Sequence, residues 1–251
     1  SAAMLEVAGL SKNFGGVQAA RDVGFTAPQG VIASLIGPNG AGKTTLFAMI
    51  TGFHRPDRGT VRFCGEDITG LSPEAIARRG MVRTFQIVQP FAGQTVRDNI
   101  AVGAHLHIAS RAGALAYAGA VARKVGLGDR LDIDAAALTV AGRKRLEVAR
   151  ALATRPKLIL LDEVMAGLNP SEIEAVIPII RAIRDEGVTV LLIEHVMQAV
   201  MSLSEHTWVL NQGEIIAEGT ASKVVADPSV IEAYLGKGMA ERMRAREAAN
   251  A

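Results

Sequence analysis

The chain has 251 residues, 49% of them hydrophobic, and its formal net charge at pH 7 is +2. This length and apolar fraction suit one large folded domain with room for two lobes. Only 4% of the residues are aromatic, and the charge is nearly balanced. We therefore predict no nucleic-acid partner, because such a partner requires a stacking surface or a strongly basic face.

Nothing in the sequence indicates a targeting or membrane-spanning segment. No window reaches about 18 uninterrupted apolar residues, and the nearest, 101–122, contains two histidines and an arginine. The N-terminus lacks a basic start followed by a long apolar run. The single cysteine, Cys64, is expected to be a buried apolar residue in a reducing compartment. We expect a cytoplasmic protein, soluble or peripheral on a membrane.

The predicted elements alternate between strands and helices. In the first half, strands are predicted over 5–10, 31–36 and 60–65, a helix over 72–79, and an alanine-rich helical stretch from about 96 to 127. In the second half, helices are predicted over 143–153 and 172–184, and strands over 157–161 and 188–193. Near-continuous apolar strands between helices indicate a parallel sheet covered on both faces. Ile173, Val176, Ile177, Ile180 and Ile183 form the apolar face of 172–184, and Pro178 is a possible bend.

The stretch Gly37-Pro-Asn-Gly-Ala-Gly-Lys-Thr-Thr45 matches the phosphate-loop pattern G-x-x-x-x-G-K-[ST] in full. It lies between a predicted strand and a helix-compatible run, as this loop requires. Glycines let its N–H groups converge on phosphate oxygens at the positive end of the helix. Lys43 is expected to reach the β- and γ-phosphates, and the Thr44 hydroxyl to bind Mg²⁺. The predicted nucleotide contacts are Asn39, Gly40, Ala41, Gly42, Lys43, Thr44 and Thr45.

Two acidic residues, Asp162 and Glu163, end the apolar strand 157–161. An aspartate at such a strand end can hold Mg²⁺, and an adjacent glutamate can act as general base toward the attacking water. His195 follows the next strand, so it is expected at the same edge of the sheet, where ligands bind in open α/β folds. No Asn is followed by Lys, so the guanine-reading motif N-K-x-D is absent.

These elements, in this order, resemble those of the ATP-binding-cassette (ABC) ATPases over nearly the whole chain. Arg83-Thr-Phe-Gln86 resembles the Q-loop, Leu138-Thr-Val-Ala-Gly142 stands at the signature, Ala166-Gly-Leu-Asn169 resembles the D-loop, and His195 resembles the H-loop. The resemblance implies hydrolysis of ATP to ADP and phosphate with Mg²⁺. It also implies a second cassette, because each ATP lies between one subunit's phosphate loop and the other's signature.

The resemblance also assigns roles to single residues. Gln86 would be a catalytic residue and Mg²⁺ ligand, beside Thr44 and Asp162, and would link to the transport partner. His195 would contact the γ-phosphate. Phe14 stands where the family has an aromatic residue that stacks on adenine, with a core position as the alternative. Gln86 and the helical insertion after it are expected to dock a permease helix through the apolar side chains of Val88, Pro90 and Phe91, which could instead pack the insertion against the core.

The signature departs from the family's L-S-G-G-Q. Without gaps, Thr139 replaces Ser, Val140 and Ala141 replace the two Gly, and Gly142 replaces Gln. Thr139 keeps a hydroxyl for the γ-phosphate, whereas Ala141 adds a methyl group where backbone must approach phosphate closely. A one-residue shift restores Gly142 to a Gly position, and the sequence leaves both alignments open. Thr139, Ala141 and Gly142 remain the predicted contacts to the opposite subunit's ATP.

Finer resemblance points to the ATPases of high-affinity branched-chain amino acid importers of bacteria and archaea. The stretches that carry this resemblance are Arg83–Gln86, Ala166–Pro170, Ile193–Met197 and Ile231–Leu235. It implies permease subunits, a second cassette that is identical or different, a periplasmic binding protein, and a place on the inner face of the cell membrane. Three alternatives remain open. The chain could belong to a related importer for amides, urea or small aromatic acids, it could be a non-transport ABC ATPase, or it could be a small-molecule kinase.

The predicted fold class is an α/β P-loop NTPase with a RecA-like core, a mixed or parallel sheet and an inserted helical subdomain. We expect one nucleotide-binding domain over 4–236. Its core lobe would span about 4–86 and 154–236, with the helical insertion over 87–153. The charged tail 237–251 is expected to be a solvated helix or a disordered end.

Overall fold

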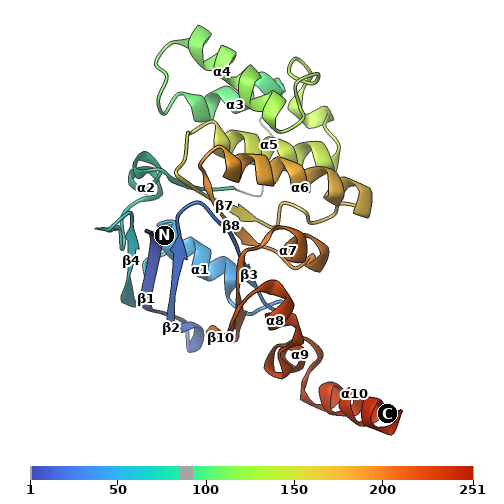
Figure 1. Ribbon diagram of the computed structural model, residues 1–251. Helices are drawn as coiled ribbons and strands as arrows, with labels where there is room; N and C mark the ends of the chain where they lie inside the picture. Colours follow the sequence, from blue (N-terminus) through green and yellow to red (C-terminus); the bar gives the residue numbers. More distant parts are fainter. Residues whose placement is uncertain (1, 85–92, 251) are drawn as a thin grey trace.

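The computed structural model describes residues 2–84 and 93–250, without the side chains of 237–240 and 243. Its central sheet has the strand order β10-β9-β3-β8-β7-β6 (Figure 1). The strands are β3 (Ile32–Ile36), β6 (Met81–Arg83), β7 (Leu158–Asp162), β8 (Thr189–Ile193), β9 (His206–Asn211) and β10 (Glu214–Gly219). All neighbours pair in parallel except β9 and β10. Every residue of β3, β7 and β8 is buried, as the apolar runs predict.

The carboxyl ends of three parallel strands meet at one edge of this sheet. Ile193 at the end of β8 pairs with Leu35 of β3 on one side and with Asp162 of β7 on the other. The segments that follow these strands are the phosphate loop, Glu163 and the pair Glu194 and His195. The sheet therefore gathers the predicted site residues from distant parts of the sequence.

A second, antiparallel sheet was not predicted. It contains β1 (Ala3–Phe14), β2 (Val17–Pro28), β4 (Arg58–Phe63) and β5 (Glu66–Asp67) in the order β2-β1-β4-β5. The prediction missed β2 because small and charged residues interrupt its alternation, and the pairing with β1 contains several register shifts. Side chains from this sheet, the central sheet and helix α1 (Lys43–Ile50) share one buried cluster, which includes Leu5, Phe47 and Leu191.

Helices inserted between β6 and β7 cover the other face of the central sheet together with α6 (Pro170–Asp185) (Figure 1). The insertion contains α3 (Val96–Ala104), α4 (Arg111–Lys124), a 3₁₀ turn (Ala135–Ala137) and α5 (Val140–Leu152). The stretch over 96–127 is helical as predicted but is divided into α3 and α4, because Ser110 starts a new helix by accepting a hydrogen bond from Gly113 N–H. The five predicted core residues of α6 are buried, and the helix continues through Pro178.

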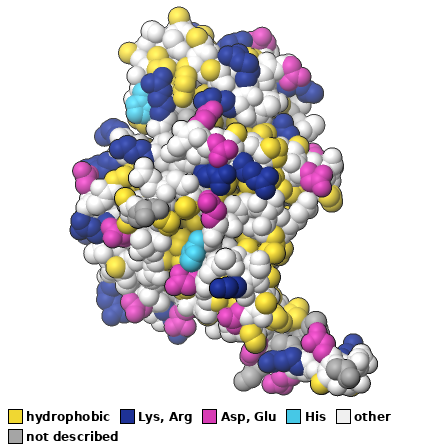
Figure 2. Space-filling model, viewed as in Figure 1, with side chains coloured by type: hydrophobic (Ala, Val, Ile, Leu, Met, Phe, Trp, Pro, Cys, Tyr) yellow, Lys and Arg dark blue, Asp and Glu magenta, His cyan; other side chains and the backbone are white. Residues whose placement is uncertain are grey.

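The C-terminal part forms short helices: α7 (Met197–Leu203), α8 (Ala221–Ala226) and α9 (Pro228–Leu235). They are followed by α10 (Lys237–Ala249), which projects from the body of the molecule (Figures 1 and 2). Between β5 and β6, α2 (Pro73–Arg79) forms where a helix was predicted, and Ser72 is its N-cap. Among the helices of the described part, none has the length and apolar character that crossing a membrane requires.

Cys64 corrects one sequence expectation. It was expected to be buried, but it is exposed in the turn between β4 and β5, with φ of 49°. The turn forces its side chain away from the core that the neighbouring Phe63 enters.

Candidate active site

A cleft of about 690 Å³ opens over the phosphate loop. All seven predicted nucleotide contacts of the loop, Asn39 to Thr45, line it. The β1–β2 hairpin supplies Gly16 to Ala19 and Arg21, the β9–β10 turn supplies Gln212 and Gly213, and Glu163 lies across from them. The cleft therefore lies at the carboxyl edge of the central sheet, the place predicted for a phosphate ligand.

Phe14 lies on the same hairpin but is not among the residues that line the cleft. Its side chain is 42% exposed, and its ring meets the His54 ring edge-on at 5.5 Å. The alternative of a core phenylalanine is therefore wrong. An exposed aromatic ring near the cleft remains available to a flat ligand.

Two glycines of the loop accept no side chain. Gly42 has φ of 100°, and a Cβ there would lie 2.5 Å from the Ala19 carbonyl oxygen. A Cβ on Gly37 would lie 2.1 Å from the Leu210 carbonyl oxygen. The backbone of the loop is thus enclosed between β2 and β9, which fixes the direction of its N–H groups.

The side chain of Lys43 is buried at the centre of the site, and its Nζ donates a hydrogen bond to the Gly37 carbonyl oxygen. Burial lowers the pKa of Lys43, while the charges of Glu163, Glu194 and Asp162 oppose this shift. The ammonium group therefore faces carboxylates from the ends of two strands.

Asp162 is buried at the end of β7 and is fixed by two residues of the neighbouring chain segment. Its N–H donates to Thr84 Oγ1 at 3.0 Å, and its Oδ2 accepts from Arg83 Nη2 at 2.6 Å. Sequence reasoning named Arg83 only as part of a motif and missed this ion pair. The signal was available in principle, because β6 pairs with β7 and both strands end at the same edge.

Glu163 adopts a left-handed backbone conformation, with φ of 51°. Its N–H donates to the Ile193 carbonyl oxygen, which ties it to the end of β8. Its Oε1 lies 3.5 Å from His195 Nδ1. The structure thus brings the predicted base and the predicted H-loop histidine together. Strained conformations of this kind persist at functional sites because the surrounding structure imposes them.

Glu194 is a buried acid that sequence reasoning missed. It is 1% exposed, and its Oε1 accepts hydrogen bonds from the N–H groups of His195 and Val196. Burial raises the pKa of Glu194, and the two N–H groups reduce this rise. The hydrogen bonds hold the turn that places His195 beside Glu163.

Glu194→Gln is expected to raise the melting temperature, and to do so more at about pH 8 than at about pH 5. The pKa of Glu194 is above its usual 4.5 in the folded chain, so folding favours the protonated form. Its contribution to stability is therefore lost as the pH rises through the raised pKa. Glutamine keeps the acceptor oxygen without the charge. Calorimetry at both pH values checks this, and an equal decrease in melting temperature at both would contradict it.

Comparison with known proteins gives the family. A family model described as "ABC transporter" matches residues 20–166. The chain belongs to the ABC transporter family. A second model, described as "Branched-chain amino acid ATP-binding cassette transporter", matches residues 214–240. The resemblance inferred from the motifs is therefore confirmed.

Several relatives match nearly the full length of this ABC cassette. The high-affinity branched-chain amino acid transport ATP-binding protein BraF of Pseudomonas aeruginosa is 42% identical, covering 93% of this chain and 98% of BraF. LivG of Escherichia coli is 38% identical with the same coverage. A crystal structure of a nucleotide-free ATP-binding cassette from an ABC transporter superposes with a TM-score of 0.87 at 32% identity, covering 94% of this chain and all of that one. The predicted α/β fold class is confirmed.

The predicted signature lies at the start of α5. Thr139 is the N-cap of this helix, and its Oγ1 accepts a hydrogen bond from Gly142 N–H at 3.1 Å. The helix begins at Val140, earlier than the predicted Arg143, so Ala141 and Gly142 belong to its first turn. None of the three predicted signature contacts lines the cleft of this chain.

Thr139→Ala is expected to lower the free energy of unfolding by about 1 kcal/mol, because the cap of α5 loses its acceptor. Thr139→Ser keeps the hydroxyl and should remain close to the parent chain. Urea unfolding of the two variants measures the difference. Equal stability of both variants would show that the cap hydrogen bond contributes little.

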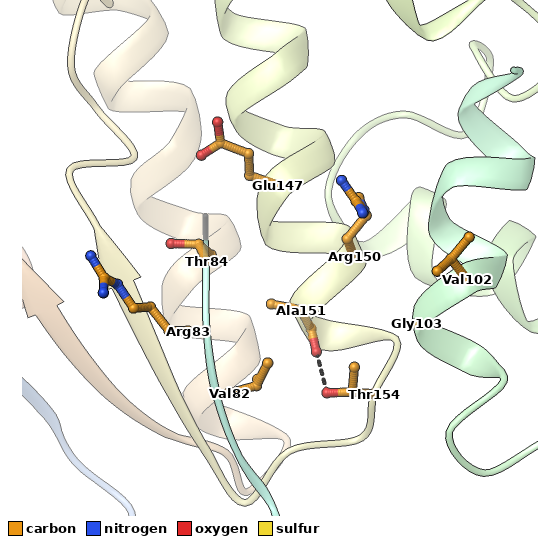
Figure 3. Close-up of a pocket in the computed structure, with 9 residues that line it drawn as sticks. All are labelled: Val82, Arg83, Thr84, Val102, Gly103, Glu147, Arg150, Ala151 and Thr154. Carbon is orange, nitrogen blue, oxygen red and sulfur yellow. Dashed lines mark hydrogen bonds between the residues drawn. The ribbon is translucent and has the colours of Figure 1, made fainter. Parts of the chain in front are cut away.

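A second pocket, of about 280 Å³, lies between the end of β6 and helices α3 and α5 (Figure 3). It is lined by Val82, Arg83, Thr84, Val102, Gly103, Glu147, Arg150, Ala151 and Thr154. Two of these lining residues, Arg83 and Thr84, are the ones that hydrogen-bond to Asp162. The predicted Gln86 and residues 87–91 follow directly, but they lie outside the described residues.

Proposed function

We propose that this chain is the ATP-hydrolysing subunit of an importer for branched-chain amino acids. The observation that carries the ATPase part is the cleft that the phosphate loop and Glu163 line at the carboxyl edge of the sheet, where the charge of Asp162, the last residue of β7, acts on the buried Lys43. The names of the relatives and the family match over 214–240 support the substrate class.

The cleft can bind the phosphates of ATP. The loop N–H groups and the start of α1 would face the phosphate oxygens, and Lys43 would move from the Gly37 carbonyl to the β- and γ-phosphates. Glu163 would accept a proton from the attacking water as general base, held beside His195, which would contact the γ-phosphate. Phe14 would stack on adenine from the hairpin.

Mg²⁺ suits the oxygen donors of this site. The hydroxyl of Thr44 and the carboxylate of Asp162 are hard ligands, and Gln86 would add an amide oxygen. Within residues 2–84 and 93–250, no group of three or more His, Cys, Asp or Glu could hold a metal by itself, so phosphates and water would complete the coordination. The ion would neutralise phosphate charge.

A second cassette, identical or different, would complete the ATP site. Thr139, Ala141 and Gly142 lie outside their own chain's cleft, as contacts to the opposite subunit's nucleotide would. We propose the domain boundaries predicted from the sequence, with the core lobe in 4–86 and 154–236 and the helical insertion in 87–153. The chain would act on the cytoplasmic face of the membrane, with a periplasmic binding protein on the other side.

The permease would dock beside the pocket of Figure 3. This pocket lies where the helical insertion meets β6, and Thr84 in its lining comes shortly before Gln86 and Phe91 in the sequence. A short permease helix placed there would touch both the insertion and the residues that hold Asp162.

Reconstitution tests the proposed function. The chain would be co-expressed with the permease subunits encoded by adjacent genes and placed in proteoliposomes containing ATP. We expect uptake of labelled leucine, isoleucine or valine that depends on ATP and on the matching binding protein. Hydrolysis with uptake of only urea, amides or aromatic acids would overturn the substrate class. Absence of hydrolysis by the full complex would overturn the ATPase assignment.

A further inference from the structure

The segment 51–57, which connects α1 to β4, anchors the end of strand β1. The N–H of Asp57 in this segment donates a hydrogen bond to the Ser11 carbonyl oxygen at 2.9 Å. Asp57 Oδ2 accepts a hydrogen bond from Asn13 N–H at 2.7 Å, and its Oδ1 accepts one from Lys12 Nζ at 3.4 Å. Residues 11–13 of β1 are therefore tied to a single residue of the segment.

The side chain of Lys12 has two further contacts that fix its direction. Its Nζ donates a second hydrogen bond, to the Arg55 carbonyl oxygen at 2.8 Å, and the side chain is only 17% exposed. The same Nζ lies over the ring of Phe14, 5.4 Å from the ring centroid. Attraction between an ammonium group and an aromatic face extends to about 6 Å. Lys12 therefore links the segment 51–57 to the aromatic ring at the end of β1.

His54 of the same segment also contacts this ring. Its imidazole meets the Phe14 ring edge-on at 5.5 Å, and its N–H donates to the Ala48 carbonyl oxygen in α1 at 3.1 Å. Helix α1 starts at Lys43 of the phosphate loop. One short segment thus connects the ring to the helix of the phosphate loop. Because 42% of the Phe14 side chain is still exposed, the ring can receive a flat ligand in addition to these contacts.

We propose that Lys12 is a positioning residue for the ring of Phe14 in nucleotide binding. The hydrogen bonds to Arg55 and Asp57 fix the ammonium group, and the ammonium group holds the ring before a base arrives. A ring that is already oriented loses less conformational entropy when a base stacks on it, so the base binds more tightly. Lys12 is not among the residues that line the cleft, so it acts through Phe14. This role rests on the proposed stacking of Phe14 on adenine.

The test is Lys12→Met in the full chain, which keeps an unbranched side chain and removes the charge and the donors. Lys12→Arg retains the charge, and the matched control is Lys124→Met, which removes a lysine from an exposed ion pair. Calorimetry measures the Kd of ADP and of inorganic triphosphate, of which only ADP has a base. In Lys12→Met we expect the Kd of ADP to rise about two- to fivefold, as for one cation–π contact, and the Kd of triphosphate to stay the same. Lys12→Arg and Lys124→Met should bind both probes as the parent chain does.

A second comparison, in Phe14→Leu, shows whether Lys12 acts through the ring. Phe14→Leu alone should weaken ADP binding, and adding Lys12→Met should weaken it no further. An unchanged Kd of ADP in Lys12→Met, an equal rise for both probes, or a further loss in the double variant would overturn the proposal. Failure of the parent chain to bind either probe, or unchanged ADP binding in Phe14→Leu, would instead contradict the proposed nucleotide site.

Discussion

Replacing Glu163 with glutamine is expected to lower ATP hydrolysis by about 10²-fold or more and to leave nucleotide binding close to normal. The side chain lines the cleft, and its carboxylate lies beside His195. Glutamine has the same length and branching, so the left-handed backbone at this position should be retained. The loss therefore reports the missing proton acceptor. Phosphate release and the Kd for ATP are the two measurements.

The control is Glu174→Gln, an equivalent change on the exposed face of α6. It should hydrolyse ATP at the parent rate. Near-normal turnover in the Glu163 variant, in the same assembled complex, would remove Glu163 from the role of general base. A large loss of ATP affinity would show that the carboxylate serves binding instead.

Arg83→Met is expected to lower the free energy of unfolding by about 3 kcal/mol, because it leaves Asp162 buried without its partner. The two side chains are only 12% and 9% exposed, and their ion pair measures 2.6 Å. Nearby Lys43 interacts with the same carboxylate and compensates part of the charge. Urea unfolding measures the difference.

A surface pair provides the comparison. Arg97 meets Asp132 at 3.4 Å, where the aspartate is 84% exposed, so Arg97→Met should change stability little. Adding Asp162→Asn to Arg83→Met should recover part of the lost stability, because the uncompensated charge disappears. No recovery in the double variant would mean that Arg83 acts through packing and not through its charge.

The sequence was sufficient for those parts of the site that lie in short contiguous motifs. The loop from Gly37 to Thr45 and the pair Asp162 and Glu163 could be predicted because each stands at the end of an apolar strand. The fold class followed from the same strands, since fully buried parallel strands read as continuous apolar runs. The parallel pairing of β8 with β3 and with β7 then places the ends of these strands, and the motifs that follow them, side by side.

Residues whose importance comes from contacts between distant segments were not predictable. Arg83 bonds a residue 79 positions away, and no local pattern records this. In the sequence, Glu194 is one acidic residue in a turn after an apolar strand. Its importance comes from its burial, which only the structure shows. The antiparallel sheet was missed because β2 is irregular and paired through bulges, so its alternation was too weak to predict a strand.

Arg83 and Thr84 have consequences for communication between the two ligands of this subunit. Both line the pocket beside which the permease is proposed to dock, and both bind Asp162 of the proposed ATP site. If occupation of the pocket shifts these two residues, it changes the affinity for nucleotide by some factor. Thermodynamic reciprocity then requires that nucleotide change the affinity for the permease by the same factor. One coupling free energy would thus link the two binding events through the end of the short strand β6. It could be measured as the effect of the permease on nucleotide affinity or as the effect of nucleotide on permease affinity.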